Sequence, residues 1–521
     1  MNWIVLGESN GRIRLVSKSG TGGILPKGSY LTIENRDEGA KFILRVDDTS
    51  QSEPFSPSPL VVEMDLSTLK QDQECQNVIS AYRVKDISAR SDGLIDFIPP
   101  QSLARKSTQD EVDLALGGQE TGPSVFIAAI HSSQNQLIKD ESGRPITARL
   151  PEEMFYHQIM VCGKTGSGKT VATKYLAQYF VEQMQGAVLA INVKDVDFLR
   201  MDRPSVARNP DVVSEWRHLD LTPRGIENYT IYYPATIPID PSQGVSPEVC
   251  KRITLDVGVI DPESLAGLLE GITDAAAQTL PSIFRYWQKM KKRPDESSFG
   301  EFVRYFSAKA EDDRTFDTIS VRGDQSIVTL HKGTCENILR NLHSAIDFFD
   351  NEDAACLDWT DILVSGKMSV INVAGKGGSQ FGSILLRDLL HKIVQAKDSQ
   401  QSKVKMLIII DEVHQFYNTD TTREALGDLD TICRTGRSKQ IGVIFSSQNP
   451  SDMPKGLANV INTKIFFKTD ATSAKSLGVR VTDEEMESLR KGFAVATIHE
   501  LSQLKVLKFP MSTAGVFEVG K

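Results

Sequence analysis

One stretch decides the fold of this chain: Ile159-Met160-Val161-Cys162-Gly163-Lys164-Thr165-Gly166-Ser167-Gly168-Lys169-Thr170. Residues 163–170 match the pattern G-x-x-x-x-G-K-[ST] at every fixed position. An apolar run comes before the glycines, and an amphipathic stretch with Val171, Tyr175 and Phe180 comes after them. This order predicts a strand, a glycine-rich loop and a helix, which is the context in which such a loop wraps around phosphate.

Each residue type in this loop has a chemical reason. Glycines let the backbone turn tightly, so that successive N–H groups point at an anion. Lys169 supplies positive charge at the β- and γ-phosphates, the hydroxyl of Thr170 can coordinate Mg²⁺, and the helix N-terminus adds a partial positive charge. We therefore expect ATP and Mg²⁺ as cofactors. The expected nucleotide-binding residues are Gly163, Lys164, Thr165, Gly166, Ser167, Gly168, Lys169, Thr170 and Val171.

A second motif lies far along the chain, where the apolar run 406–410 ends in Asp411 and Glu412. A buried strand that delivers two acids at its carboxyl end suits ATP hydrolysis. We expect Asp411 to hold Mg²⁺ together with Thr170, and Glu412 to orient and deprotonate the attacking water. The alternative is the acidic first turn of a helix, and the phosphate loop upstream favours the catalytic interpretation. We interpret the nearby His414 as a hydrogen-bonded helix residue in preference to a catalytic one.

An amide follows the next predicted strand. The apolar run from Gly442 to Ser446 predicts this strand, and Gln448 comes directly after it, before Pro450. A polar amide at this edge of the sheet suits a sensor of the γ-phosphate. The alternative is a simple strand-to-loop turn ended by the proline.

A group of cations lies just before that strand, at Arg434, Arg437 and Lys439. It predicts either a solvated loop or, in a ring-shaped ATPase, an arginine finger that reaches the site of a neighbouring subunit. Arg437 is the first candidate for the finger and Arg434 the second. The expected catalytic residues are therefore Glu412, Lys169, Gln448, Arg437 and Arg434.

The composition limits the class of protein. The 521 residues are 40% hydrophobic and 24% charged, as in ordinary soluble proteins. Apolar runs are far shorter than the roughly 18 residues of a membrane helix, and the N-terminus does not look like a signal peptide, so a cytoplasmic location is expected. Six scattered cysteines without a C-x-x-C pair predict reduced thiols. A net charge of −9 restricts any DNA-binding surface to a local groove or pore.

Patterning divides the chain into four parts. Residues 1–120 have short apolar runs between turn signals, which predicts a small β-barrel, with a polar linker at 102–123. From residue 124, β-runs alternate with helical stretches, which predicts a mostly parallel sheet with crossover helices. A helix-rich block follows residue 245, and in it Pro281 would split one long stretch into two helices. The expected domains are 1–120 (barrel), 121–245 (ATPase core, first part), 246–358 (helical insertion) and 359–521 (ATPase core, second part).

Together these motifs resemble the HerA family of hexameric ATPases, within the wider HerA/FtsK group. The matching stretches are Val161 to Thr170, Ile409 to Phe416, Arg434 to Arg437 and Ser447 to Pro454. The segment from Leu25 to Leu31 looks like the family's N-terminal barrel. The resemblance implies an α/β fold: a RecA-like P-loop NTPase core with a mostly parallel sheet, an N-terminal small β-barrel and an inserted helical bundle.

The resemblance also implies a homo-hexameric ring with ATP at the subunit interfaces, double-stranded DNA in the central pore and no membrane partner. It further implies a nuclease, or in bacterial antiviral defence a Sir2-type NAD-consuming effector, docked on the barrel side. The expected function is a DNA translocase or helicase driven by ATP hydrolysis. The alternative is an ATP-gated scaffold that regulates an effector with little translocation. A transporter-type ATPase is set aside because its LSGGQ signature is missing, and a small-molecule kinase does not explain the acidic pair.

One position departs from the family pattern. Family members commonly carry an Asp at the end of the strand after the first crossover helix, followed by a Gly-Glu turn. This chain instead has Asn192, then Lys194 and Asp195. Asn192 cannot carry the same negative charge, so a metal or pore role at this position would fall to Asp195.

Three weaker patterns suggest contact with DNA phosphates. They are the basic run from Gln288 to Arg293, the loop from Gly375 to Gln380, and Lys455. Each of them also fits an ordinary solvated surface, which is the more common role of such charges.

Overall fold

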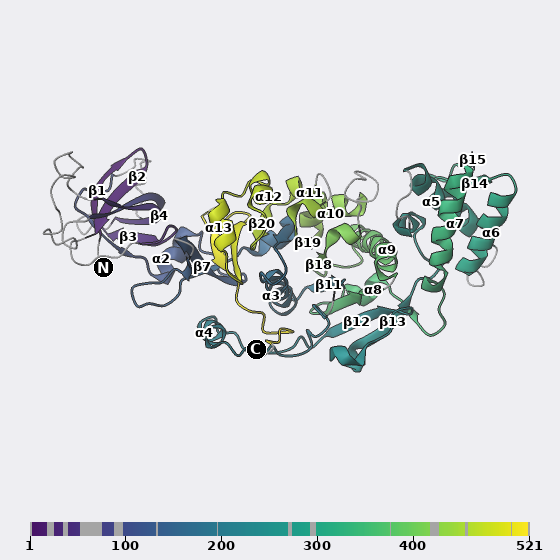
Figure 1. Cartoon of the computed structure of the whole chain (residues 1–521), viewed down its shortest axis with the longest axis horizontal. Helices are drawn as coiled ribbons and strands as arrows, with labels where there is room; N and C mark the ends of the chain where they lie inside the picture. The colour runs from purple at the N-terminus through teal and green to yellow at the C-terminus, as the bar shows by residue number, and fades with distance from the viewer. Residues whose placement is uncertain are drawn as a thin grey trace, which may run out of the picture. The chain divides into compact units, whose positions relative to one another are not determined.

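The computed structural model describes residues 3–17, 25–34, 40–52, 76–87, 97–131, 134–194, 196–268, 274–291, 298–375, 377–416, 427–453, 457–501 and 503–518 (Figure 1). The chain folds into two compact units. The first unit comprises residues 1–154, 163–168 and 463–510, and the second unit comprises residues 155–162, 169–462 and 511–521.

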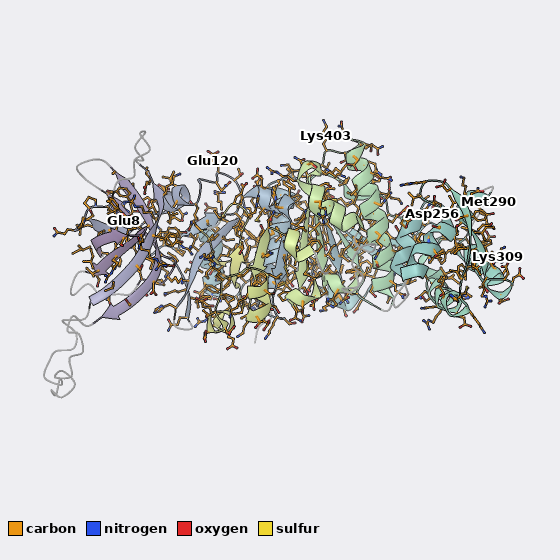
Figure 2. The ribbon with its side chains drawn as sticks, turned by 90° about the horizontal axis from the view of Figure 1, so that it is seen from above. Glu8, Glu120, Asp256, Met290, Lys309 and Lys403 are labelled. Carbon is orange, nitrogen blue, oxygen red and sulfur yellow. The ribbon has the colours of Figure 1, made fainter. Side chains whose placement is uncertain are left out.

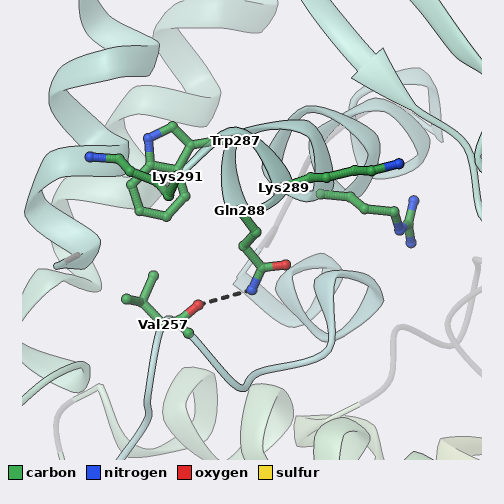
Figure 3. A pocket seen from close by; sticks show the side chains of 7 residues that line it. Val257, Trp287, Gln288, Lys289 and Lys291 are labelled. Carbon is green, nitrogen blue, oxygen red and sulfur yellow. Dashed lines mark hydrogen bonds between the residues drawn. The ribbon is translucent and has the colours of Figure 1, made fainter. Parts of the chain in front are cut away.

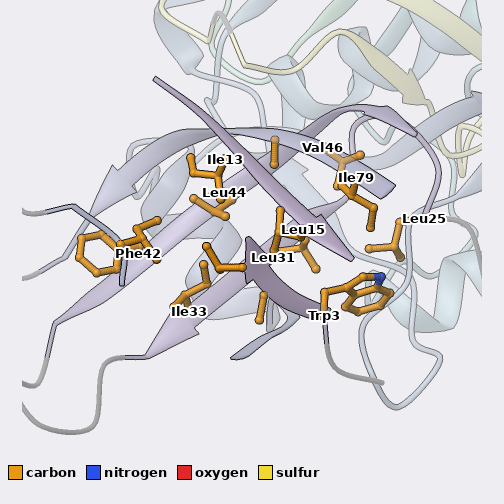
Figure 4. Close-up of a cluster of buried hydrophobic side chains, with 14 of the residues drawn as sticks. Trp3, Ile13, Leu15, Leu25, Leu31, Ile33, Phe42, Leu44, Val46 and Ile79 are labelled. Carbon is orange, nitrogen blue, oxygen red and sulfur yellow. The ribbon is translucent and has the colours of Figure 1, made fainter. Parts of the chain in front are cut away.

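A closed antiparallel barrel opens the first unit, with the strand order β1-β2-β5-β4-β3-β6. The strands are β1 (Trp3–Ser9), β2 (Arg12–Ser17), β3 (Tyr30–Glu34), β4 (Lys41–Ser52), β5 (Gln76–Asp86) and β6 (Leu103–Lys106). In β2, Ile13 and Leu15 are buried while the two intervening arginines are exposed, because side chains alternate between the faces of a strand. Figure 4 shows these two side chains in the barrel interior with Trp3, Leu31 and Leu44. The predicted barrel is confirmed.

The linker predicted at residues 102–123 is wrong. Strand β6 pairs with β1 and β3 and closes the barrel. Its sequence looks polar because only Ala104 of the strand is buried. The helix α2 (Gln109–Ala115) follows, and a reciprocal capping box between Thr108 and Glu111 begins it.

The rest of the first unit is an antiparallel sheet with the order β20-β21-β22-β7-β8, in which β9 also pairs with β7. Its strands are β7 (Ser124–His131), β8 (Gln134–Leu137), β9 (Thr147–Arg149), β20 (Thr463–Phe466), β21 (Phe493–Thr497) and β22 (Val506–Lys508). Two short helices, α12 (Ala471–Ser476) and α13 (Asp483–Ser488), connect β20 to β21.

The second unit is built on a parallel sheet with the order β16-β13-β12-β17-β11-β18-β19-β10. Its strands are β10 (Ile159–Cys162), β11 (Ala187–Asn192), β12 (Tyr229–Pro234), β13 (Cys250–Thr254), β16 (Ala355–Cys356), β17 (Met368–Asn372), β18 (Met406–Asp411) and β19 (Ile441–Ser447). Strands β11, β18 and β19 are buried at every position, which explains their continuous apolar sequences. The predicted α/β class with a mostly parallel sheet is confirmed.

Helices connect these strands, as parallel pairing requires. The α-helices are α3 (Lys169–Glu182), α4 (Pro210–His218), α8 (Trp359–Ile362), α9 (Gly378–Asp398), α10 (Gly427–Lys439) and α11 (Leu457–Val460). The 3₁₀ turns are η2 (Glu152–His157), η3 (Pro241–Gln243), η4 (Pro247–Val249), η8 (Val413–Gln415) and η9 (Pro450–Asp452).

A helical block is inserted between β13 and β16. It contains η5 (Pro262–Leu268), α5 (Asp274–Met290), α6 (Phe299–Glu311), β14 (Thr315–Ile319), β15 (Gln325–Thr329), α7 (Lys332–Ser344) and η7 (Ile346–Phe348). Aromatic side chains form its core, with the rings of Phe284 and Phe302 4.8 Å apart. The predicted break at Pro281 is wrong, because α5 runs through it. Burial of Leu280, Ile283 and Phe284 beside it outweighs the roughly 3 kcal/mol that an interior proline costs.

Exposed side chains such as Glu120, Met290 and Lys403 project from the ribbon (Figure 2). Within the described residues, every helix is too short or too polar to span a lipid bilayer. The cysteines with described side chains, Cys162, Cys250, Cys335 and Cys356, are free thiols.

Candidate active site

The glycine-rich loop joins β10 to α3, so the predicted order of strand, loop and helix is present. Gly166 and Gly168 have φ angles of 80° and 110°, a region that favours glycine. A Cβ on Gly163 would lie 2.5 Å from Oγ of Ser167, and one on Gly168 would lie 2.9 Å from the backbone N of Gly492. Alanine at Gly163 or Gly168 would therefore force neighbouring atoms to move.

The polar groups of the loop suit an anion. Oγ of Ser167 is buried and has no hydrogen-bond partner in the described part of the chain. A buried polar group without a partner costs roughly 1–3 kcal/mol, which points to a ligand that would satisfy it. The side chains of Lys164 and Thr165 are exposed, and the N–H of Lys164 is held by a 2.8 Å hydrogen bond to the carbonyl of Lys468.

The first turn of α3 carries the remaining residues of the motif. Thr170 and Val171 are half-buried there, while Lys169 is buried. Nζ of Lys169 donates a 3.1 Å hydrogen bond to Oδ1 of Asp411, the last residue of β18. The same oxygen accepts a 2.6 Å hydrogen bond from Oγ of Ser446, which lies opposite Asp411 on β19. A hydroxyl on α3 and a carboxylate on β18 are the oxygen ligands that Mg²⁺ prefers, so this donor set fits the expected cofactor.

Glu412 follows directly and is 2% exposed. Its oxygen Oε1 accepts a 2.8 Å hydrogen bond from Nζ of Lys194 and a 2.9 Å hydrogen bond from Nε2 of Gln448. Nζ of Lys169 lies 3.8 Å from the same oxygen. Burial alone would raise the pKa of the Glu412 carboxyl, but the hydrogen bonds from Lys194 and Gln448 and the charge of Lys169 bring the pKa below its usual value.

The other oxygen of Glu412, Oε2, is buried and has no hydrogen-bond partner in the described part of the chain. The residue also has a left-handed backbone conformation, with φ of 49° and ψ of 57°. Strained backbone conformations cluster at active sites. An unsatisfied buried acceptor indicates a role such as binding a ligand or water.

Strand ends bring these residues together. In the parallel sheet, Ile191 lies opposite Ile410, Asp411 opposite Ser446, and Cys162 opposite Ser447. The carboxyl ends of β11, β18, β19 and β10 therefore meet at one edge, where ligands bind in open α/β sheets. Gln448 follows β19 and reaches Glu412 from that position.

The segment after Gln448 is held by Asp452. Its Oδ2 accepts hydrogen bonds from Oγ of Ser447 at 2.7 Å and from the N–H of Asn449 at 3.2 Å. His414 lies in the 3₁₀ turn η8 rather than in the expected helix. Its Nδ1 lies 3.7 Å from Oε2 of Glu412 and 3.9 Å from Oδ2 of Asp452, with the ring 40% exposed.

The two candidate finger arginines lie on the helix α10 and not in a loop, and their exposure still fits the solvated surface considered as the alternative. Both Arg434 and Arg437 are exposed. Within the described residues, the Arg437 side chain makes no hydrogen bond or ion pair with the acidic cluster of its own chain.

Sequence reasoning missed two contributors to this cluster, Lys194 and Ser446. Lys194 lies two residues beyond the end of β11, and β11 pairs with β18. The signal that could have revealed both residues was a polar side chain at the end of a strand that neighbours β18.

Asn192 has a structural role. Its Nδ2 donates a hydrogen bond to Oδ1 of Asn372 at 2.9 Å, and its Oδ1 accepts one from the N–H of Phe198 at 3.1 Å.

Of the weaker DNA-contact candidates, Lys292, Arg293, Lys376 and Lys455 lie outside the described residues. Asp195, the alternative to Asn192 for a metal or pore role, also lies outside them. The first part of the basic run lines a pocket of about 280 Å³ (Figure 3). Nζ of Lys291 lies 5.2 Å from the ring centre of Trp287 and 2.7 Å from a carboxylate oxygen of Glu301. Lys289 is exposed.

The solved structures that match this chain have low sequence identity to it. The bacterial conjugative coupling protein TrwB, in its unbound form, is 13% identical with a TM-score of 0.47, covering 80% of this chain and 94% of that chain. TrwB in complex with ADP and Mg²⁺ is 14% identical with a TM-score of 0.46, covering 75% and 94%. VirB4 of Thermoanaerobacter pseudethanolicus is 13% identical with a TM-score of 0.44, covering 76% and 97%. A search of curated proteins gives no match.

Two family models match the sequence. The one described as "Helicase HerA, central domain" matches residues 136–375, and the one described as "Helicase HerA-like C-terminal" matches residues 372–503. Together they span residues 136–503, which include the glycine-rich loop, the acidic pair and Gln448. The chain therefore belongs to the HerA family of P-loop ATPases.

Proposed function

We propose that this chain is the subunit of a ring-shaped motor that hydrolyses ATP and moves along double-stranded DNA. One observation carries the ATPase part. The cation of the phosphate-loop motif contacts the two acids at the carboxyl end of β18, with Nζ of Lys169 3.1 Å from Asp411 and 3.8 Å from Glu412. A phosphate-binding cation, a metal-binding acid and a candidate base in mutual contact suit the hydrolysis of a nucleoside triphosphate.

Each residue around the acidic pair would have a separate role in hydrolysis. Lys169 would exchange the carboxylate of Asp411 for phosphate oxygens, and Asp411 and Thr170 would then be free to hold Mg²⁺. When bound, Mg²⁺ would neutralise charge that develops on the phosphates. Glu412 would accept a proton from the attacking water at Oε2, and Gln448 would link that carboxylate to the γ-phosphate side of the site.

Assembly into a homo-hexamer would complete the site. Arg437 is exposed on α10 and makes no ion pair in the described part of its own chain, so it is available to a neighbouring subunit. An arginine supplied in trans stabilises the negative charge of the transition state and couples hydrolysis to contact between subunits. Arg434, three residues earlier on the same helix, is the second candidate.

Duplex DNA in a central pore is the proposed track, and a nuclease or a Sir2-type effector docked on the barrel is the proposed partner. The net charge of −9 requires the DNA-facing surface to be local. In a ring, a few lysines per subunit would be repeated around the pore, which is enough for contact with phosphates independent of sequence.

The test is ATP hydrolysis by the purified chain, with and without linear double-stranded DNA, and with Lys169→Ala as the blank. Strong stimulation by DNA is the expected result, and a translocation assay would follow. Hydrolysis that does not respond to DNA would contradict the motor and favour an ATP-gated scaffold for an effector enzyme. Activity in the Lys169→Ala variant equal to that of the wild type would overturn the site itself.

A further inference from the structure

The two oxygens of the Glu412 carboxylate have opposite environments. Oε1 accepts hydrogen bonds from Lys194 at 2.8 Å and from Gln448 at 2.9 Å, whereas Oε2 is buried without a hydrogen-bond partner in the described part of the chain. Rotation of the carboxylate to bring Oε2 to a donor would break both hydrogen bonds at Oε1. The arrangement therefore keeps one specific oxygen of Glu412 available for a proton.

Lys194 is an unusual member of this cluster. Its side chain is 42% exposed, yet its ammonium group reaches a carboxylate whose side chain is 2% exposed. A partly exposed lysine that is tied to one partner loses rotamer freedom, and a typical exposed ion pair returns too little free energy to offset that loss. Burial of the Glu412 carboxylate is what makes the contact favourable here, because an unpaired buried carboxylate is far more costly.

We propose that Lys194 is a positioning residue for hydrolysis, which anchors Oε1 of Glu412 so that Oε2 faces the attacking water. The inference rests on the proposed ATPase function. In the step concerned, the proton of the water passes to Oε2 as the new bond from its oxygen to the γ-phosphorus forms. At the same time the bond from phosphorus to the bridging oxygen breaks and ADP leaves.

The other two groups near Oε1 cannot replace Lys194. Lys169 is farther away, at 3.8 Å, and the proposed function assigns its charge to the phosphates. Gln448 is neutral and supplies one hydrogen bond without compensating the buried charge. Lys194 is thus the cation that remains at Oε1 of Glu412 once Lys169 binds phosphate.

The test compares Lys194→Met with Lys194→Arg in the full-length protein. Methionine keeps most of the aliphatic stem and removes the charge, so kcat is expected to fall on the order of a hundredfold, as misplacement of a catalytic group does. Affinity for a fluorescent ATP analogue should change by less than about threefold, because Lys194 contacts Glu412 and not the loop. Arginine should restore part of kcat, since its guanidinium can donate to the same oxygen.

Lys475 provides a matched control. Its side chain is 44% exposed and its Nζ lies 2.8 Å from the exposed carboxylate of Asp483, so Lys475→Met removes an ion pair of the same length from a lysine of similar exposure. This control removes a lysine of similar exposure away from Glu412, so it should keep wild-type kcat.

Several outcomes would overturn the inference. They are an unchanged or higher kcat in Lys194→Met, an equal loss in Lys475→Met, or a loss confined to nucleotide affinity. If Lys194→Met is fully active while Glu412→Gln is inactive, the positioning role fails and the ATPase stands. If the wild-type protein does not hydrolyse ATP under any condition, the proposed function fails.

Discussion

Nζ of Lys169 lies 3.1 Å from Oδ1 of Asp411, and the two side chains are 8% and 6% exposed. A buried ammonium or carboxylate without a partner is costly, so each of these groups requires the other in this structure. A ligand that separates them must offer a substitute for both charges. An anion for Lys169 together with a cation for Asp411 meets this requirement, and a nucleoside triphosphate with Mg²⁺ supplies both.

Lys169→Ala removes the cation from this pair and leaves Asp411 without its ionic partner. We expect loss of most nucleotide binding and of all ATP hydrolysis, because the phosphates lose their main positive charge. Binding of a fluorescent ATP analogue and release of phosphate measure the two effects. Nucleotide affinity within a few-fold of wild type would show that the loop is not the nucleotide site.

Glu412→Gln keeps the size of the side chain and removes the base. We expect ATP binding close to wild type and hydrolysis reduced by at least about a hundredfold, the lower end of what general-base catalysis contributes. Single-turnover hydrolysis and nucleotide binding, measured on the same sample, separate the two steps. Glu484→Gln, an exposed acid on α13, serves as the control and should behave as wild type. Wild-type hydrolysis by Glu412→Gln would show that another residue is the general base.

Arg437→Ala tests whether neighbouring subunits share one site. Hydrolysis should fall by roughly a thousandfold or more if the arginine acts in trans. Mixtures of Arg437→Ala and Glu412→Gln subunits should recover part of the activity, because some interfaces then combine an intact arginine with an intact glutamate. Arg304→Ala, at a surface arginine with a 78% exposed side chain, is the control. If no mixing ratio recovers activity, the trans assignment is wrong.

Glu111 fixes α2 to the barrel. It pairs with Lys41 and Arg105 at 2.6 Å each and accepts a 2.7 Å hydrogen bond from the hydroxyl of Thr32. Burial would raise the pKa of the Glu111 carboxyl, but these donors and the N–H of Thr108 hold it well below its usual range. Glu111→Gln should destabilise the barrel by roughly 1–3 kcal/mol, since charged hydrogen bonds are lost.

The pH dependence of this contribution has a defined sign. A carboxyl whose pKa is lower in the folded state stabilises the fold above its unfolded pKa of about 4.3. The contribution is lost as the pH falls from there toward the folded pKa. Hydrogen exchange of β3 and α2 amides, corrected for intrinsic rates, should show this loss in wild type and little of it in Glu111→Gln. The exposed neighbour Asp110, changed to Asn, should retain the wild-type profile.

Prediction from local sequence succeeded where the structure depends on residues close together in the chain. The turn from β10 through Gly166 and Gly168 into α3 depends on backbone conformations that few residues other than glycine adopt, so the spacing of the motif reveals it. Prediction from local sequence failed where the stabilising contacts come from residues distant in the sequence. Strand β6 looks like a linker because its partners are β1 and β3, and α5 continues through Pro281 because packing within the helical block holds it.

The amino-acid sequence by itself determined the α/β class, the phosphate loop, the acidic pair at the end of β18 and the amide after β19, because each depends on residues adjacent in the chain. Only the tertiary structure decided that Lys194 and Gln448 converge on one oxygen of Glu412, while the other has no hydrogen-bond partner in the described part of the chain. The physical reason is the parallel sheet. It places the carboxyl ends of strands far apart in sequence at one edge, and the order of those strands follows from packing of the whole sheet.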